Sequence, residues 1–264
     1  MLLRSRPVHI IPVLDLKGGQ VVRAERGRRD LYRPIVTPLS ASADIAAVAA
    51  GLRMLHPFPA FYVADLDAIM GGAPDEAVLA ALRGMDRPPE LWVDAGLREA
   101  GPLAAALAKP WLRPVLGSES QADDALLRRF SGHPGLVLSL DFTAEGFRGP
   151  PAILKHAEIW PSTVIVMTLA KVGAGAGPDF GRLQGIVARA GNRAVVAAGG
   201  VRGAADLRAL ASLGIAGALV ATCLHDGDLA PPQIGALSDE FPARCGTAVP
   251  AAPLSGTVRQ QTGA

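Results

Sequence analysis

The feature that most constrains the fold is a regular alternation between short apolar runs, rich in β-branched residues, and longer stretches rich in alanine and leucine. This alternation is typical of strands and helices that follow one another in a parallel sheet. The apolar runs predict eight strands, at 9–14, 60–66, 90–95, 113–117, 136–141, 163–169, 194–199 and 217–222. The intervening helices are clearest at 42–55, 75–84, 99–108, 121–130, 179–190 and 203–213. Eight such pairs predict an α/β protein with the (β/α)8 TIM barrel fold.

Length and composition agree with a single barrel. The chain has 264 residues, 50% of them hydrophobic and 19% charged, and a barrel of this type needs roughly 250 residues. The predicted strands are nearly continuous apolar runs, as expected where helices cover a sheet outside and side chains fill it inside. Toward the C-terminus the helical periodicity is lost and Gly, Pro, Ser and Thr accumulate. We therefore expect a barrel over residues 1–242 and a flexible tail over 243–264.

Charge and cysteine usage exclude several classes of partner. The 26 Lys and Arg residues nearly balance the 24 Asp and Glu residues, and the basic residues are scattered, which disfavours a nucleic-acid surface. No apolar segment has the length of a membrane span or the form of an export signal, so we expect no membrane partner and a cytoplasmic location. The two cysteines and five histidines lack metal-ligand spacing, so we expect reduced thiols and no metal. The sequence specifies no oligomeric state.

An internal repeat is visible within the predicted barrel. AGLR at 95–98 and GGVR at 199–202 have the same shape, and in each case another strand end, at Gly117 or Ala221, follows 19 residues after the arginine. Asp15 ends the first predicted strand and Asp141 ends the fifth, so the two aspartates also correspond when one half is laid on the other. The simplest explanation is a pair of (βα)4 halves, which would place Asp15 and Asp141 opposite each other at the mouth.

Glycine-containing turns after several strands are candidate phosphate sites. A glycine between a strand and a helix lets backbone N–H groups approach an anion at the positive end of the helix dipole. Gly199 and Gly200 have this position, and phosphate binding after the seventh and eighth strands recurs in this fold. The weaker candidates are Gly96, Arg98, Gly117, Ser118 and Thr222. The alternative for each glycine is a tight turn without a ligand.

The two matched aspartates are the strongest catalytic candidates. Asp15 precedes Lys17-Gly18-Gly19, and Asp141 ends the run LVLSLD, so both carboxylates are expected at the rim of the barrel. Two carboxylates in different environments can divide general-base and general-acid work. The alternative is a pair of aspartates that only cap loops.

Other polar residues at strand ends are weaker candidates. They are Asp65 and Asp67 after the second strand, Asp94 in the third, and Thr168 and Lys171 after the sixth. A lysine with a lowered pKa could form a Schiff base with a carbonyl substrate, although a solvated charge is the more common role.

The segment IIPVLDLKGGQVVRAERG at 10–27 resembles the opening of the HisA/HisF family of histidine-pathway barrels, and SLDF, MTLAK, AAGGVRGAADL and LGSES follow in the family's order. The likeness extends over about residues 8–240. It implies a barrel that grips phosphates in both halves, with Asp15 as base, Asp141 as acid and Thr168 at a third catalytic position. In the family's isomerase, the acid opens a ribose ring and the base removes a proton next to an iminium carbon, an Amadori rearrangement that needs no cofactor. Lys17 and Gly19 in the first motif are expected near the substrate.

The chain departs from the family pattern at three places. After Thr168 it has LAKVGAGAGPD where the family has an Asp-Gly-Thr loop, and Asp94-Ala95-Gly96 replaces three glycines. Ala221 stands where a glycine is expected. These differences are expected to alter one phosphate site and the loop around the substrate.

The stretch GRRDLYRP, with Arg29 and Tyr32, resembles a divergent HisA/HisF-related group associated with coenzymes of the tetrahydromethanopterin and methanofuran type. An arginine in this loop can clamp an anion and a tyrosine ring can stack on a heterocycle, or the two can merely stabilise the loop. Three functions therefore stay open: an isomerase or lyase acting on a phosphorylated sugar or sugar-linked heterocycle, an enzyme of coenzyme assembly that uses Lys171 or Asp65, and a non-catalytic binder of a phosphorylated ligand.

Overall fold

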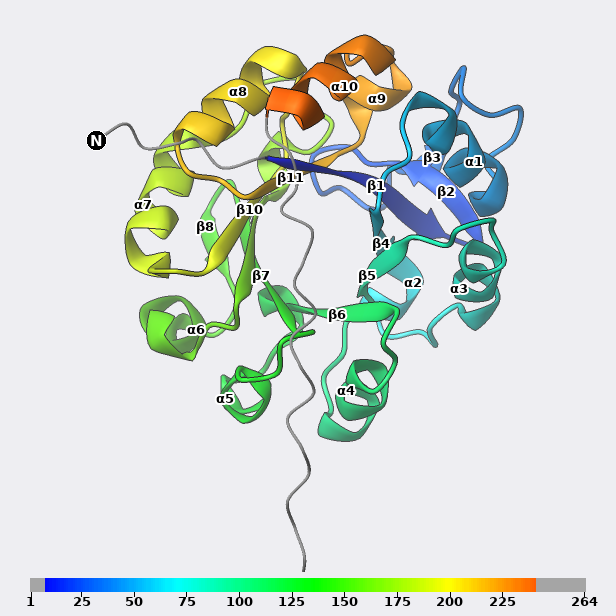
Figure 1. Ribbon diagram of the computed structural model, residues 1–264. Helices are drawn as coiled ribbons and strands as arrows, with labels where there is room; N and C mark the ends of the chain where they lie inside the picture. Colours follow the sequence, from blue (N-terminus) through cyan, green and yellow to red (C-terminus); the bar gives the residue numbers. More distant parts are fainter. Residues whose placement is uncertain (1–7, 241–264) are drawn as a thin grey trace, which may run out of the picture.

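Eight parallel strands close into a barrel in the computed structural model, which describes residues 8–240 (Figure 1). The ring runs through β1 (His9–Lys17), β4 (Ala60–Asp65), β5 (Glu90–Asp94), β6 (Leu112–Gly117), β7 (Val137–Thr143), β9 (Thr163–Thr168), β10 (Ala194–Ala198) and β11 (Gly217–Val220). Parallel pairing of β1 with β11, from His9 opposite Gly217 to Pro12 opposite Val220, closes the ring. The expected TIM barrel is confirmed.

Helices lie around the outside of the ring (Figure 1). The longer ones are α1 (Ile45–Leu55), α3 (Glu76–Arg83), α4 (Ala100–Leu107), α5 (Ala125–Phe130), α7 (Phe180–Ala190), α8 (Ala204–Ser212) and α10 (Pro231–Glu240). Short helices fill the remaining connections, namely α2 (Leu66–Ile69), η1 (Ser118–Ser120), α6 (Pro151–Lys155), η2 (Ala157–Ile159), η3 (Leu169–Lys171) and α9 (Thr222–His225). All eight predicted strands and six predicted helices are present with end points shifted by a few residues, whereas the short helices carry too few residues to show a period.

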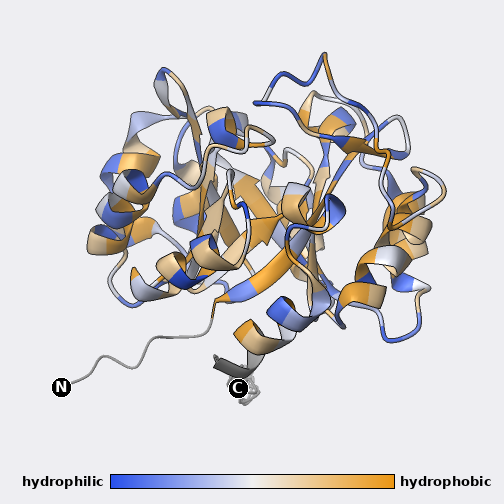
Figure 2. Cartoon of the chain, turned by 90° about the horizontal axis from the view of Figure 1, so that it is seen from above, coloured by the Kyte–Doolittle hydropathy of each residue, from blue (hydrophilic) through white to orange (hydrophobic). Residues whose placement is uncertain are grey.

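Apolar side chains form two layers, one inside the barrel and one between barrel and helices. Tyr62, Trp92 and Ile165 belong to the inner cluster, while Leu14, Phe61 and Leu138 belong to the larger outer cluster. Neighbouring strand residues thus face opposite layers, which explains why each strand is apolar throughout. Figure 2 shows this distribution, with apolar colour on the central strands and polar colour on the outer faces of the helices.

Two strands of the ring extend past the barrel and fold back on themselves. After β1 the chain returns as β2 (Gln20–Arg23), antiparallel to β1, and β3 (Arg33–Pro34) pairs with β2. After β7 it returns as β8 (Gly146–Arg148). Asp15 lies opposite Val22 in one hairpin, and Asp141 lies opposite Arg148 in the other. Both aspartates are therefore held by strand pairing on each side, which limits the movement of their backbones.

Aspartates begin several helices. The Asp44 and Asp75 carboxylates accept hydrogen bonds from the N–H groups of Ala47 and Val78, and Asp179 does the same for Arg182. Asp206, in the first turn of α8, accepts the N–H of Arg202. Carboxylates at these positions favour the exposed N–H groups of the first helical turn. No helix among residues 8–240 is both long and apolar enough to cross a bilayer. The tail predicted at 243–264 lies outside the described residues.

Candidate active site at the mouth of the barrel

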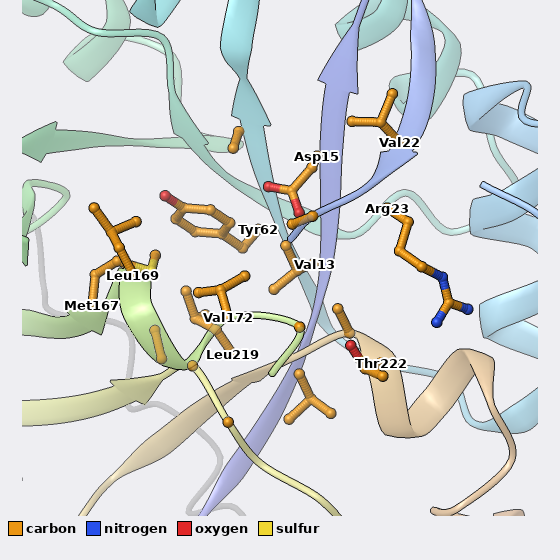
Figure 3. Close-up of a pocket in the computed structure, with 18 of the residues that line it drawn as sticks. Val13, Asp15, Val22, Arg23, Tyr62, Met167, Leu169, Val172, Leu219 and Thr222 are labelled. Carbon is orange, nitrogen blue, oxygen red and sulfur yellow. The ribbon is translucent and has the colours of Figure 1, made fainter. Parts of the chain in front are cut away.

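A cavity opens at the C-terminal ends of the strands, with about 1320 Å³ of empty space that includes open solvent at its mouth. Asp15 and Asp141 both line it. In the ring, β1 and β7 are separated by three strands in either direction, so the two carboxylates belong to opposite walls. Figure 3 shows Asp15 and Tyr62 reaching into this space, with Arg23 and Thr222 farther along the wall. The ends of barrel strands are where enzymes of this fold place their chemistry.

The Asp15 side chain faces the cavity and accepts no hydrogen bond from any other residue within 8–240. Its surroundings are apolar enough that burial raises its pKa to about 7, although the positive charge of Arg29 opposes the rise. A carboxylate with free lone pairs and a pKa close to neutral is suited to take up a proton.

Asp141 is buried and held by three hydrogen bonds. Ser139 Oγ donates to Asp141 Oδ1 at 2.6 Å, and Oδ2 accepts from Ser118 Oγ at 3.1 Å and from the Glu119 N–H at 3.0 Å. Burial raises the pKa of Asp141 to about 6, and these hydrogen bonds limit the rise because they favour the ionised form. The side chain is therefore fixed in orientation and titrates near neutral pH.

Asp94 forms a carboxylate pair with Asp141. A Cβ added to Gly117 would stand 3.1 Å from Asp94 Oδ2 and 3.5 Å from Asp141 Oδ2, so both oxygens lie close to one point. Burial, followed by the charge of Asp141, raises the pKa of Asp94 to about 7. Two like charges this close disfavour double ionisation, so the pair retains a proton near neutral pH.

The glycine turn after β10, a predicted phosphate site, lines the cavity. Gly199 and Gly200 have φ angles of +99° and +86°, and an added Cβ would stand 2.6 Å from Thr168 O and 2.4 Å from Gly177 O respectively. Only glycine fits this turn. Thr222 lines the same wall, as does Arg202, whose guanidinium pairs with Asp206.

The four predicted phosphate residues in the turns after β5 and β6 lie outside the cavity lining, whereas Glu119, in the turn after β6, belongs to it. They are Gly96, Arg98, Gly117 and Ser118. The Gly96 N–H donates to Asp94 Oδ1, and the Arg98 guanidinium donates to the carbonyl oxygens of Gly96 and Ile69. Ser118 is fully buried, and its Oγ bonds to Asp141 and to the carbonyl oxygen of Arg148. Gly117 packs against the carboxylate pair. The four residues that the sequence predicts as phosphate ligands on this side are thus engaged within the protein.

The remaining predicted substrate residues divide between the cavity and its surroundings. Arg29 and Tyr32 line the cavity. Thr168 does not line it. The other four predicted residues also lie outside the lining, namely Lys17, Gly19, Asp65 and Lys171. Lys17 Nζ donates to Arg29 O, Gly19 turns the β1–β2 hairpin with φ +73°, Asp65 caps α2 and accepts the Asp75 N–H, and Lys171 Nζ donates to Ala176 O.

Several cavity residues had weak or no signal in the sequence. Asp94 stood out only as one of several polar residues near strand ends. Tyr62 sits inside an apolar strand and reads as core, and Glu119 is placed by the short η1 turn. His225 hydrogen-bonds through Nδ1 to Thr37 Oγ1 at 3.1 Å, and burial lowers its pKa to about 4. The departure of the DAG segment from the family pattern was a second clue to Asp94. Within residues 8–240, no cluster of three or more His, Cys, Asp or Glu side chains could hold a metal ion.

Comparison with known proteins agrees with the geometry. The family model described as "Histidine biosynthesis protein" matches residues 9–230. An imidazole-4-carboxamide isomerase of the phosphoribosyl type from Symbiobacterium thermophilum is 31% identical over 83% of this chain and 92% of its own length. An isomerase of the same name from Rhodopseudomonas palustris is 32% identical over 86% of this chain and 96% of its own length. Phosphoribosyl isomerase A of Streptomyces griseus is 30% identical over 83% of this chain and 92% of its own length. The chain belongs to the HisA/HisF family of histidine biosynthesis proteins, on the isomerase side of that family.

Proposed function

We propose that this protein is an isomerase of the HisA type, acting on a phosphorylated sugar derivative by aspartate acid/base catalysis. The observation that carries the proposal is the placement of Asp15 and Asp141 on opposite walls of one cavity, both with pKa values near neutral. The names of the relatives describe isomerases of phosphoribosyl compounds, and the glycine turn after β10 is suited to a phosphate. The reference reaction is the conversion of an aminoaldose into an aminoketose.

The reaction requires proton transfers on opposite sides of the sugar. Asp141 donates a proton to the ring oxygen as the ring opens, and the nitrogen lone pair at C1 forms an iminium ion. Asp15 then removes the proton from C2, which leaves an enaminol. Addition of a proton at C1 and loss of the proton from the C2 hydroxyl convert the enaminol into the aminoketose. No electron leaves or enters the system, so two positioned carboxyl groups supply the chemistry that the rearrangement needs.

The carboxylate pair supports the assignment of the acid. Because Asp94 and Asp141 disfavour simultaneous ionisation, the pair keeps a proton that Asp141 can deliver. Burial alone raises the pKa of Asp15, and the positive charge of Arg29 favours its ionised form, as a base requires. Thr168 lies outside the cavity lining, which leaves Asp15 as the base and Asp141 as the acid.

Replacement of Asp15 by Asn tests the base. Turnover should fall by about 10²–10⁴-fold, the range that general acid–base groups contribute, while the far-UV circular dichroism spectrum stays that of the folded barrel. The measurement is isomerisation of a phosphoribosylamino compound in D2O, with deuterium at C1 of the ketose product recorded by NMR. Asp86→Asn, at an exposed position outside the cavity, is the matched control and should keep wild-type turnover. Full activity in Asp15→Asn would refute the assignment.

A growth test separates the histidine pathway from other substrates. Rescue of a histidine auxotroph that lacks the isomerase would identify the histidine-pathway reaction. Deuterium exchange without rescue would indicate a different phosphorylated substrate. Ligand-induced stabilisation with neither exchange nor rescue would indicate a binding protein and would refute the isomerase proposal.

A further inference from the structure

Arg29 reaches across the mouth of the cavity from one wall to another. Its carbonyl oxygen accepts a hydrogen bond of 2.7 Å from the Nζ of Lys17, the last residue of β1. Its guanidinium pairs with Glu119, which follows β6, and both side chains line the cavity. In the ring, β4 and β5 separate β1 from β6. The backbone of Arg29 is therefore held at the end of the strand that carries Asp15, whereas its charge lies toward the wall formed by β6.

Glu119 is held from three directions. Its backbone N–H donates to Asp141 Oδ2 at 3.0 Å. Its Oε1 pairs with Arg29, and its Oε2 lies 3.3 Å from Arg148 Nε. The side chain is 9% exposed. A carboxylate that is shielded from water and charge-paired through both oxygens is a well-oriented partner for a guanidinium.

Arg29 lies within range of two further carboxylates. Burial raises the pKa of Asp15 and of Asp94, and the positive charge of Arg29 opposes both rises. Among residues 8–240, however, Arg29 forms an ion pair with Glu119 and with neither aspartate. The charged and titratable groups that face Arg29 or Asp15 are Glu119, Asp94, Tyr32 and Tyr62. The ion pair with Glu119 thus decides which carboxylate the guanidinium touches.

Direct contact between Arg29 and Asp15 would weaken the base. A guanidinium that pairs with an aspartate occupies its lone pairs and lowers its pKa by about 1–3 units, so the carboxylate accepts a proton less readily. Figure 3 shows the Asp15 side chain reaching into the cavity, where a substrate would meet it. Since Lys17 anchors Arg29 two residues beyond Asp15 on the same strand, Asp15 is the carboxylate that a released Arg29 would meet.

From this arrangement we propose that Glu119 is a positioning residue, which restrains Arg29 and thereby keeps the Asp15 carboxylate free to act as the base. The proposal rests on the isomerase function above, in which Asp15 removes the proton from C2. It gives the turn after β6 a part in both proton transfers, because the backbone N–H of the same residue holds Asp141.

A pair of substitutions in the full-length protein tests the restraint through turnover at saturating substrate. Glu119→Gln keeps the size of the side chain and removes its charge, so Arg29 should move to Asp15. Turnover should fall roughly tenfold or more, toward the 10²–10⁴-fold that a general base contributes. Adding Arg29→Met to Glu119→Gln should restore turnover to within about threefold of Arg29→Met alone, since residues in one ion-pair network are not additive. A double variant as slow as Glu119→Gln would overturn the proposal, because the loss would then not pass through Arg29.

The pKa of Asp15 is a readout that a purely structural role of Glu119 would not move. It can be followed by ¹³C NMR of the carboxyl carbon, with Asp15→Asn to assign the signal. Glu119→Gln should lower this pKa by about one unit or more, because Arg29 then pairs with Asp15. Arg29→Met should raise it, because a positive charge that favours the ionised form is removed. An unchanged pKa in Glu119→Gln would contradict the restraint.

Two further variants complete the test. Arg148→Met breaks the other ion pair of Glu119, at an arginine outside the cavity lining. It should leave the pKa of Asp15 unchanged and turnover within about twofold of wild type, since exposed ion pairs contribute little. Glu119→Asp keeps the charge on a side chain one methylene shorter, so its turnover should lie between wild type and Glu119→Gln. It replaces Glu119→Gln in both measurements if that variant does not fold.

The result is separable from that of the proposed isomerase function. Turnover reports the isomerase, whereas the carboxyl titration needs no substrate. If the protein isomerises its substrate but the pKa of Asp15 ignores Glu119, this inference fails and the isomerase stands. If the pKa responds as expected but no phosphoribosylamino compound is converted, the restraint on Arg29 stands and the isomerase function fails.

Discussion

Asp141 shows how neighbouring groups set the chemistry of one residue. Burial and the charge of Glu119 raise its pKa, while hydrogen bonds from Ser139, Ser118 and the Glu119 N–H lower it, with Ser139 the largest of these. The balance leaves the pKa at about 6, so small changes in the surrounding donors should move the protonation of this group through the working range.

Substitution of Ser139 by Ala removes the 2.6 Å hydrogen bond to Asp141 Oδ1. The ionised form loses a donor, so the pKa of Asp141 should rise, by roughly one unit if the hydrogen bond contributes about 1.5 kcal/mol. The limb of the pH–rate profile that reports the acid should shift to higher pH by the same amount. Ser212→Ala, an exposed serine on α8, should leave the profile unchanged. A profile unmoved in Ser139→Ala would show that Asp141 is not the titrating acid.

Among the helices, α1 keeps a glycine, Gly51, at a position where helix propensity alone would favour alanine. Gly51 lies within the helix, where alanine is normally preferred by about 1 kcal/mol. An added Cβ would stand 1.9 Å from the carbonyl oxygen of Leu39, in the loop that leads into α1. This close approach lets the loop lie against the helix, and Leu39 packs on the outer core. The glycine is therefore required by tertiary contact.

Two glycine-to-alanine substitutions separate propensity from packing. Gly51→Ala should lower the free energy of unfolding by about 1–3 kcal/mol, because the loop backbone must move. Gly185→Ala in α7, where nothing lies within 4 Å of an added Cβ, should raise it by about 0.5–1 kcal/mol. Urea unfolding of both variants under identical conditions is the measurement. A stabilising Gly51→Ala would contradict the contact with Leu39.

At the scale of the whole molecule, the site lowers the stability of the fold as pH rises. The folded-state pKa values of Asp15, Asp94 and Asp141 are about 7, about 7 and about 6, above the value of 3.8 for a free side chain. The folded protein thus binds more protons than the unfolded chain between pH 4 and pH 7. The stability these groups contribute is fully present below about pH 3.8 and is lost as pH rises through their folded-state pKa values.

We therefore expect the free energy of unfolding to fall by about 3 kcal/mol between pH 5.5 and pH 8. His225 opposes this trend below about pH 6.5, because its folded-state pKa of about 4 lies under the value of 6.5 for a free side chain. This single histidine offsets only part of the stability change caused by the three aspartates. Urea unfolding at several pH values gives the profile, and Asp94→Asn should flatten it. Stability that rises steadily from pH 5.5 to pH 8 would contradict the burial of these carboxylates.

Local pattern was sufficient to predict the barrel, because each element has its own signature. The strands are apolar on both faces, the longer helices repeat every three to four residues, and the Asp179 and Asp206 carboxylates mark helix starts. The position of Asp15 and Asp141 at strand ends followed from the same pattern, since a parallel barrel brings all such ends to one face. The hairpins that hold these residues were not predicted, because β2, β3 and β8 have four residues or fewer.

The character of the site depended on contacts between residues far apart in the chain. The order of strands and helices, and the glycines that turn the chain after β10, could be read from local pattern. Closure of the ring places Asp94 beside Asp141 across Gly117, pairs Glu119 with Arg29, and lets the protein's own carboxylates accept the N–H groups in the turns after β5 and β6. Periodicity indicates which face of an element is buried, whereas the pKa of a carboxyl and the accessibility of a turn depend on neighbours that are distant in the chain.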